Sequence, residues 1–185
     1  MKIKIFIASP RKKGNTELLV DSLIKGVKLE DKKVEIEKIF LNDMNIKLCQ
    51  GLEKCRKTGK CPINDDCQVL FKKIKEAEVV VLASPNYWAS YTAQLKIFLD
   101  RWGVFLTEDY QSRIEGKKMV LVAVCGNSNI EHAEYVIKDM KKAFSSLKLN
   151  IIGELKASAN KKGAVLKNKK ILKKAFALGK KLVKL

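Results

Sequence analysis

The sequence is poor in the residues that build several common kinds of site. It has one histidine, His132, among 185 residues, which excludes metal sites with several histidines and leaves Cys–His or Ser–His catalysis dependent on a single imidazole. We expect His132 to be an exposed helix residue. Three prolines and ten glycines are too few for a collagen-like or low-complexity chain. Apolar runs such as Val79 to Ala83 are short, and no run approaches the length that a transmembrane helix needs.

Arginine is also scarce, although the chain is strongly basic. Lysine and arginine number 38 against 20 acidic residues, a net charge of +18. The only arginines are Arg11, Arg56, Arg101 and Arg113. Specific readers of nucleic acid depend on the bidentate arginine fork, whereas lysines create a diffuse, salt-sensitive field. We therefore expect a solvated basic surface that gathers anionic dinucleotides or acidic redox partners, and we do not expect a nucleic-acid partner.

The first ten residues, MKIKIFIASP, have the apolar character of a secretion signal, but Lys4 interrupts the run and a polar loop follows. We interpret them as a strand and the protein as cytoplasmic, without membrane insertion. The length favours one domain over 1–185, with a cysteine-bearing excursion at about 43–67. Long excursions of this kind inside compact domains are usually functional.

Strand and helix patterns alternate along the chain. Strands are predicted at 2–8, 34–41, 79–83, 119–125 and 150–155, and helices at 15–27, 67–77, 89–104, 131–147 and 169–185. This alternation predicts an α/β fold, because crossover helices join parallel strands and cover both faces of the sheet. We expect a doubly wound five-stranded parallel sheet, flavodoxin-like, in the strand order 2-1-3-4-5, within a three-layer sandwich.

In such a sheet a ligand lies beyond the carboxyl ends of the strands, so the loops after the first, third and fourth strands matter most. The first loop, 9–16, contains hydroxyls, an amide and Arg11, and it opens a helix that Asn15 or Thr16 can cap. Free N–H groups at the helix start favour an anion such as a phosphate. The alternative is a purely structural turn. The loop is neither a P-loop nor a dinucleotide fingerprint.

The loop after the third strand, 84–88, places aromatic rings beside the same crevice. Main-chain N–H groups around Asn86 could bind the polar edge of a flat heterocycle, and Tyr87 or Trp88 could cover its face. The alternative for Trp88 is that it packs into the core. The third loop, 125–128, adds glycine and small polar groups after Cys125, which we interpret as a buried residue at a strand end.

Four segments now carry a resemblance to a known family. They are SPRKKGNT (9–16), GKCPINDD (59–66), VVVLASPNYW (79–88) and QLKIFLDR (94–101). In this order the sequence resembles the flavodoxin-like NADPH-dependent FMN reductase family, including its iron-sulfur flavoprotein branch, as far as about residue 126. The resemblance implies bound FMN and, usually, homodimers or homotetramers. It assigns the cofactor to Ser9, Arg11, Gly14, Asn15, Thr16, Ser84, Pro85, Asn86, Tyr87, Trp88 and, less directly, Gly126.

The expected function is therefore that of an oxidoreductase. Reducing equivalents would pass from NAD(P)H through FMN to a quinone, a flavin, a protein electron carrier or another acceptor. No protein acid or base is required, so we name no catalytic side chain. The alternatives are an iron-sulfur flavoprotein, or a flavodoxin-like electron-transfer protein without its own NAD(P)H activity.

The cysteines of the excursion depart from the pattern of the iron-sulfur branch. That branch resembles C-x-x-C-x-x-C followed by a fourth cysteine, and alignment on GKC puts its ligands at Cys49, 52, Cys55 and Cys61, where residue 52 is Leu52. A four-thiolate cluster would therefore need Cys67 as an unusual ligand. The chain has no C-x-x-C pair to support a zinc site. We expect free thiols rather than a metal, an iron-sulfur cluster or a redox disulfide.

Overall fold

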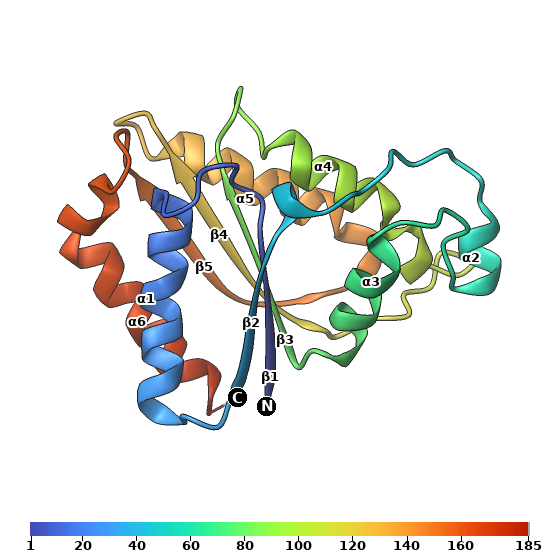
Figure 1. The fold of residues 1–185 in the computed structure, drawn as a ribbon, viewed down its shortest axis with the longest axis horizontal. Coiled ribbons are helices and arrows are strands. Elements are labelled where there is room, and N and C mark those ends of the chain that lie inside the picture. Colours follow the sequence, from blue (N-terminus) through green and yellow to red (C-terminus); the bar gives the residue numbers. More distant parts are fainter. Residues whose placement is uncertain (185) are drawn as a thin grey trace.

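The computed structural model describes residues 1–184, and a five-stranded parallel sheet lies at its centre (Figure 1). The strands are β1 (Lys2–Ile7), β2 (Glu35–Phe40), β3 (Val79–Pro85), β4 (Lys118–Cys125) and β5 (Asn150–Ser158). They are hydrogen-bonded in the order β2-β1-β3-β4-β5, and every neighbouring pair is parallel. The predicted fold class and strand order are therefore confirmed.

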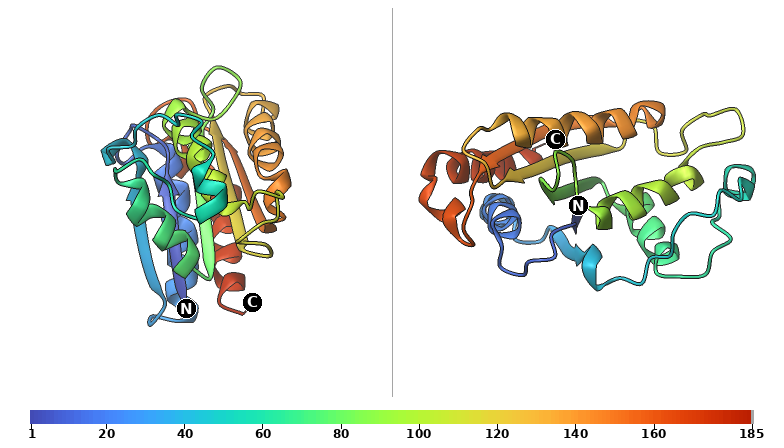
Figure 2. Two further views of the ribbon diagram at one scale, coloured as in Figure 1. Left: turned by 90° about the vertical axis from the view of Figure 1, so that its right-hand side faces the viewer. Right: turned by 90° about the horizontal axis from the view of Figure 1, so that it is seen from above.

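Helices cover both faces of this sheet. They are α1 (Asn15–Glu30), α2 (Lys54–Thr58), α3 (Cys67–Glu76), α4 (Ala93–Asp100), α5 (Glu131–Ala143) and α6 (Lys169–Leu182), with 3-10 helices η1 (Leu41–Asp43), η2 (Arg101–Phe105), η3 (Ser145–Leu147) and η4 (Ala164–Lys167). Helices α1 and α6 lie side by side at one end of the molecule, and α2 lies at the other end (Figures 1 and 2).

Strand β3 shows why the sheet needs two helical layers. All residues from Val79 to Ser84 are buried. Val79 and Val81 belong to the core cluster that includes α1 and α6, whereas Val80 and Leu82 belong to the cluster that includes α3, α4 and α5. The continuous apolar run is thus explained by burial on both faces.

Helices α1 and α6 pack with their backbones unusually close. A Cβ atom on Gly26 would lie 2.0 Å from the carbonyl oxygen of Phe176, and one on Gly179 would lie 2.0 Å from that of Leu23. Only glycine fits at such distances, so these two residues fix the position of α1 against α6. Because the loop after β1 leads into α1, this packing also positions the start of that helix at the edge of the sheet.

Several predicted boundaries differ from the structure. The helix expected from residue 89 begins at Ala93, because Tyr87 and Ser90 exchange two main-chain hydrogen bonds and Thr92 caps the helix. Strand β5 continues three residues past its predicted end, and the short α2 was not expected. Of the predicted helix at 169–185, residue 185 lies outside the described residues. Within 1–184 no helix has the length and apolar character needed to cross a membrane.

Candidate functional site

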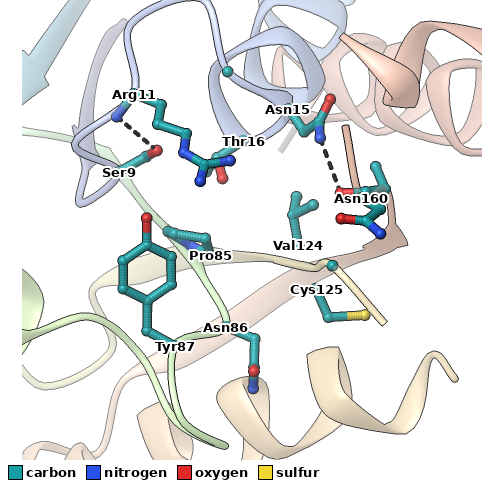
Figure 3. Close-up of a pocket in the computed structure, with 13 residues that line it drawn as sticks. Ser9, Arg11, Asn15, Thr16, Pro85, Asn86, Tyr87, Val124, Cys125 and Asn160 are labelled. Carbon is teal, nitrogen blue, oxygen red and sulfur yellow. Dashed lines mark hydrogen bonds between the residues drawn. The ribbon is translucent and has the colours of Figure 1, made fainter. Parts of the chain in front are cut away.

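A cleft opens where the sheet reverses its strand order, at the carboxyl ends of β1, β3, β4 and β5 (Figure 3). Its cavity measures about 190 Å³. It is lined by Ser9, Arg11, Gly14, Asn15, Thr16, Pro85, Asn86, Tyr87, Val124, Cys125, Gly126, Ala159 and Asn160. This is the place where doubly wound sheets bind their ligands.

The structure brings nine of the eleven sequence-predicted residues to this cavity, namely Ser9, Arg11, Gly14, Asn15, Thr16, Pro85, Asn86, Tyr87 and Gly126. Ser84 is fully buried instead, where its hydroxyl accepts from the Thr92 N–H and donates to the Pro85 carbonyl. Trp88 is fully exposed at a positive φ of 49°. The alternative that Trp88 packs into the core is therefore wrong, and neither residue lines the cavity.

The start of α1 forms one wall of the cleft. Gly14 precedes the helix in an extended conformation and gives no side-chain cap, so the expectation that Asn15 or Thr16 caps this helix is wrong. Within the described residues the N–H groups of Asn15 and Thr16 have no hydrogen-bond partner. A Cβ at Gly14 would lie 2.8 Å from the Arg11 carbonyl oxygen, so this tight turn requires glycine. Free N–H groups and the helix dipole together favour an anion here.

Polar side chains surround these free N–H groups. The guanidinium of Arg11 points into the cavity in Figure 3 and has no hydrogen bond or ion pair within 1–184. The Ser9 hydroxyl accepts from the Arg11 N–H at 3.3 Å, and the hydroxyl of Thr16 has no partner among the described residues. None of the cavity-lining residues of the described chain carries a carboxylate. The site therefore has positive potential and hydrogen-bond donors without an opposing charge.

The nearby carboxylate of Glu17 holds the turn in place. It accepts hydrogen bonds from the Lys13 N–H at 2.6 Å and from the Lys38 ammonium at 3.0 Å. Burial would raise the pKa of Glu17, but the bonds from Lys38 and Lys13 outweigh burial and lower that pKa. Glu17 is therefore ionised at neutral pH, and its charge is balanced by Lys38.

The side chain of Asn15 joins α1 to the loop after β5. Its amide nitrogen donates to the carbonyl oxygens of Ala159 and Lys161, each at 2.9 Å, and its amide oxygen accepts from the Val165 N–H at 3.2 Å. The side-chain amide thus makes its hydrogen bonds to the protein itself. What Asn15 offers to the cavity is its main-chain N–H.

The opposite wall is aromatic. The ring of Tyr87, 40% exposed, points into the cavity (Figure 3). The Asn86 N–H donates to the Val124 carbonyl at 2.7 Å, its amide donates to the His132 carbonyl at 2.8 Å, and the Tyr87 N–H donates to Ser90. The expectation of free main-chain N–H groups in this turn is therefore wrong. The Tyr87 ring is what this loop contributes.

Sequence reasoning missed four lining residues, Val124, Cys125, Ala159 and Asn160. Cys125 is buried at the end of β4, as expected, but it also touches the cleft. Asn160 follows β5, whose end was predicted too early. The rule that parallel strands end at one edge of the sheet could have found it. Within the described residues the Asn160 amide has no hydrogen bond, so it can meet a ligand.

Comparison with protein families gives one match over most of the chain. Residues 1–163 match the model of a family described as NADPH-dependent FMN reductase. An iron-sulfur flavoprotein of Methanocaldococcus jannaschii is 42% identical over 101 residues, which are 55% of this chain and 51% of that protein. A Bacillus subtilis protein named as an NAD(P)H-dependent FMN-containing oxidoreductase is 24% identical over 96% of both chains. This chain thus spans about half of the first relative and nearly all of the second.

Solved structures share the fold. The NAD(P)H:quinone oxidoreductase of Methanothermobacter marburgensis superposes with a TM-score of 0.72 at 18% identity, over 98% of this chain and 96% of that one. The azoreductase AzrA has the same TM-score at 16% identity, over 98% and 100% of the two chains. At these identities the likeness shows a common flavodoxin-like architecture.

Proposed function

The chain belongs to the NADPH-dependent FMN reductase family, and on that premise we propose that it is an oxidoreductase that binds FMN in the cleft and passes reducing equivalents from NAD(P)H to a quinone, a flavin or another acceptor. The observation that carries the proposal is the uncapped start of α1. It faces the cleft with free N–H groups and an unpaired guanidinium beside it. Those are the donors that a phosphate monoester needs.

The residues present fit the phosphate end of FMN. The N–H groups of Asn15 and Thr16, the hydroxyls of Ser9 and Thr16, and the guanidinium of Arg11 would hold it. Each is a donor to an anionic oxygen, and hydrogen bonds to charged groups are among the stronger ones in proteins. Asn15 would also act through its side chain, because its bonds to the loop after β5 keep that loop against the start of α1.

The part of the cleft that would face the flavin ring encloses less of the cofactor than the part that would hold its phosphate. The cavity of about 190 Å³ is smaller than the roughly 300–1,000 Å³ of a typical small-molecule site, so it would enclose one end of FMN and leave the other at the mouth. There Pro85 and Tyr87 would lie against the ring, with Gly126 and Asn160 at its edge. An open face is what a second, flat reactant requires.

FMN, when bound, would supply the hydride-accepting ring, which no side chain can provide. The chain's own residues bind and orient it. Fixing two reactants in this way can supply on the order of 7–11 kcal/mol at best. No side chain is assigned as an acid or base. The net charge of +18 would attract the anionic dinucleotide at low salt.

Anaerobic reduction tests this function. The purified protein should be yellow, acid should release FMN, and NADPH or NADH should bleach the colour rapidly without oxygen. A yellow protein that neither nucleotide bleaches would be an electron carrier without its own NAD(P)H activity, which would refute the proposed reductase.

A variant pair tests the phosphate contacts in the same protein. Arg11→Ala should weaken FMN binding about 10- to 100-fold, the effect of losing a hydrogen bond to a charged group. Arg113→Ala removes the same charge from the part of the chain that contacts α2, and it should leave FMN affinity unchanged. Equal affinities in the two variants would place the anion site elsewhere.

The family also leads us to propose a single-domain chain that forms a cytoplasmic homodimer or homotetramer. Light scattering of the FMN-loaded protein tests the assembly, and a monomeric mass at micromolar concentration would reject it.

A further inference from the structure

The cysteine segment, which we define as residues 43–67, raises a question because several relatives are named iron-sulfur flavoproteins. Cubane clusters are normally held by four thiolates. Here residue 52, where the branch pattern has a cysteine, is Leu52, and its side chain is 52% exposed. This leaves Cys49, Cys55 and Cys61, and a fourth thiolate would have to come from elsewhere.

Cys67 does not fit as that fourth ligand. It is completely buried at the start of α3 and belongs to the apolar core with Leu70 and Phe71, whereas Cys49 is exposed. Among the described residues, no group of three or more cysteine, histidine or acidic side chains is placed to hold a metal ion. The residues present therefore do not fit an iron-sulfur cluster.

A guanidinium lies where the segment meets the core. Arg101, at the start of η2, is 2% exposed, and its side chain and that of Asp65 are fully buried. One terminal nitrogen donates to Asp65 at 2.6 Å and to the Lys47 carbonyl at 2.8 Å. The other donates to the sulfur of Cys61 at 3.0 Å. A cation bonded to this sulfur repels an iron ion and competes for the same lone pairs.

Asp65 extends the same network to both ends of the segment. Its carboxylate accepts from the N–H of Lys47 at 2.9 Å and from the N–H of Cys67 at 3.0 Å. One buried ion pair thus ties together parts of the segment that are 20 residues apart in sequence and joins them to η2. A buried charge pair with this many hydrogen bonds can hold a loop in a single conformation.

We infer that the buried Arg101–Asp65 pair holds the cysteine segment in place and that the segment takes up no iron-sulfur cluster. A consequence rests on the proposed function. Without a cluster in the segment, electrons would leave directly from FMN, so the acceptor would approach the open side of the cleft beside Tyr87.

The iron content tests whether the cysteine segment takes up a cluster. The protein is produced with added iron, purified without oxygen, and treated with ferrous ion and sulfide. After gel filtration it should hold no more iron or sulfide than the matched variant Cys49→Ser/Cys55→Ser/Cys61→Ser. About four iron and four sulfide per wild-type chain, lost in the variant, would overturn the inference. FMN is measured in the same samples, so a failure of FMN binding is seen separately from a failure of the iron result.

Hydrogen exchange tests whether the Arg101–Asp65 pair holds the cysteine segment in place. In iron-free wild-type protein the amides of Lys47 and Cys67 should exchange slowly, because both donate to Asp65. In Arg101→Met they should exchange faster, on the order of tenfold or more, since a buried carboxylate loses its partner. Arg113→Met is the control, because Arg113 is an exposed arginine that donates to the same segment at the Arg56 carbonyl. If Arg101→Met does not fold, rapid exchange at both wild-type amides would still refute the inference.

Discussion

Replacement of Asn15 by alanine separates two roles for this side chain. If the amide binds phosphate directly, Asn15→Ala weakens FMN binding and leaves the apoprotein stable. The structure indicates the other role, because all three hydrogen bonds of the amide go to the segment between Ala159 and Val165. We therefore expect Asn15→Ala to destabilise the protein even without FMN.

The size of the effect follows from these three bonds. Those to the Ala159 carbonyl and the Val165 N–H are partly buried, and each is worth about 1 kcal/mol. The bond to the Lys161 carbonyl is exposed, so water replaces it at less cost. The sum is about 2–3 kcal/mol, and at about 2–4 °C per kcal/mol for a chain of this size the melting temperature should fall by about 4–12 °C.

Thermal unfolding of the apoprotein, followed by circular dichroism, measures this fall. Asn42→Ala is the matched control, because Asn42 is an exposed amide with one bond, to Gln94 at 3.2 Å, and should change stability by less than about 0.5 kcal/mol. A melting temperature for Asn15→Ala within about 1 °C of wild type, together with weak FMN binding, would show that the amide contacts phosphate and that the reasoning above is wrong.

Three further predictions concern packing, pH and thiols. Gly26→Ala should destabilise the protein by about 1–3 kcal/mol in urea unfolding, despite the better helix propensity of alanine, because α6 must move. Burial would raise the pKa of Asp65, but the bonds from Arg101 outweigh it and lower that pKa. The free energy of unfolding that Asp65 contributes is therefore complete above about pH 4 and is lost as the pH falls further. Urea unfolding at pH 3 and pH 7 measures this loss, and the loss should be smaller in Asp65→Asn than in the wild type. Burial raises the pKa of Cys67 to about 12, so Ellman's reagent should modify exposed Cys49 quickly and Cys67 only on unfolding; quick modification of native Cys67 would contradict its burial.

The sheet was predictable because a strand that is buried on both faces has a continuous run of apolar residues. The short β-branched run Val79 to Ala83 is typical of a strand covered on both faces, and its alternation with amphipathic helices predicts the topology. The first loop was predictable for another reason, since ligands of a doubly wound sheet lie beyond the carboxyl ends of its strands and this loop follows the first strand. These two inferences placed most of the cleft.

The rest depended on contacts between distant segments. Asn15 looked like a ligand residue because nothing in the sequence shows that its amide meets a backbone about 150 residues away. Trp88 looked like a ring or core residue, but the turn between Tyr87 and Ser90 directs it to solvent. Nothing in the sequence shows what Arg101 contacts, and only the folded excursion shows its buried partner, Asp65.

The comparison of FMN with riboflavin tests the central claim most directly, because the two ligands differ only in the phosphate that the start of α1 is proposed to hold. Apoprotein is titrated with each, and quenching of flavin fluorescence gives the two dissociation constants. Hydrogen bonds to a charged group contribute about 1.5–3 kcal/mol each, so FMN should bind at least about 100-fold more tightly than riboflavin. Equal affinities, or no uptake of FMN by the apoprotein, would contradict the assignment of the phosphate to the N–H groups of α1 and Arg11.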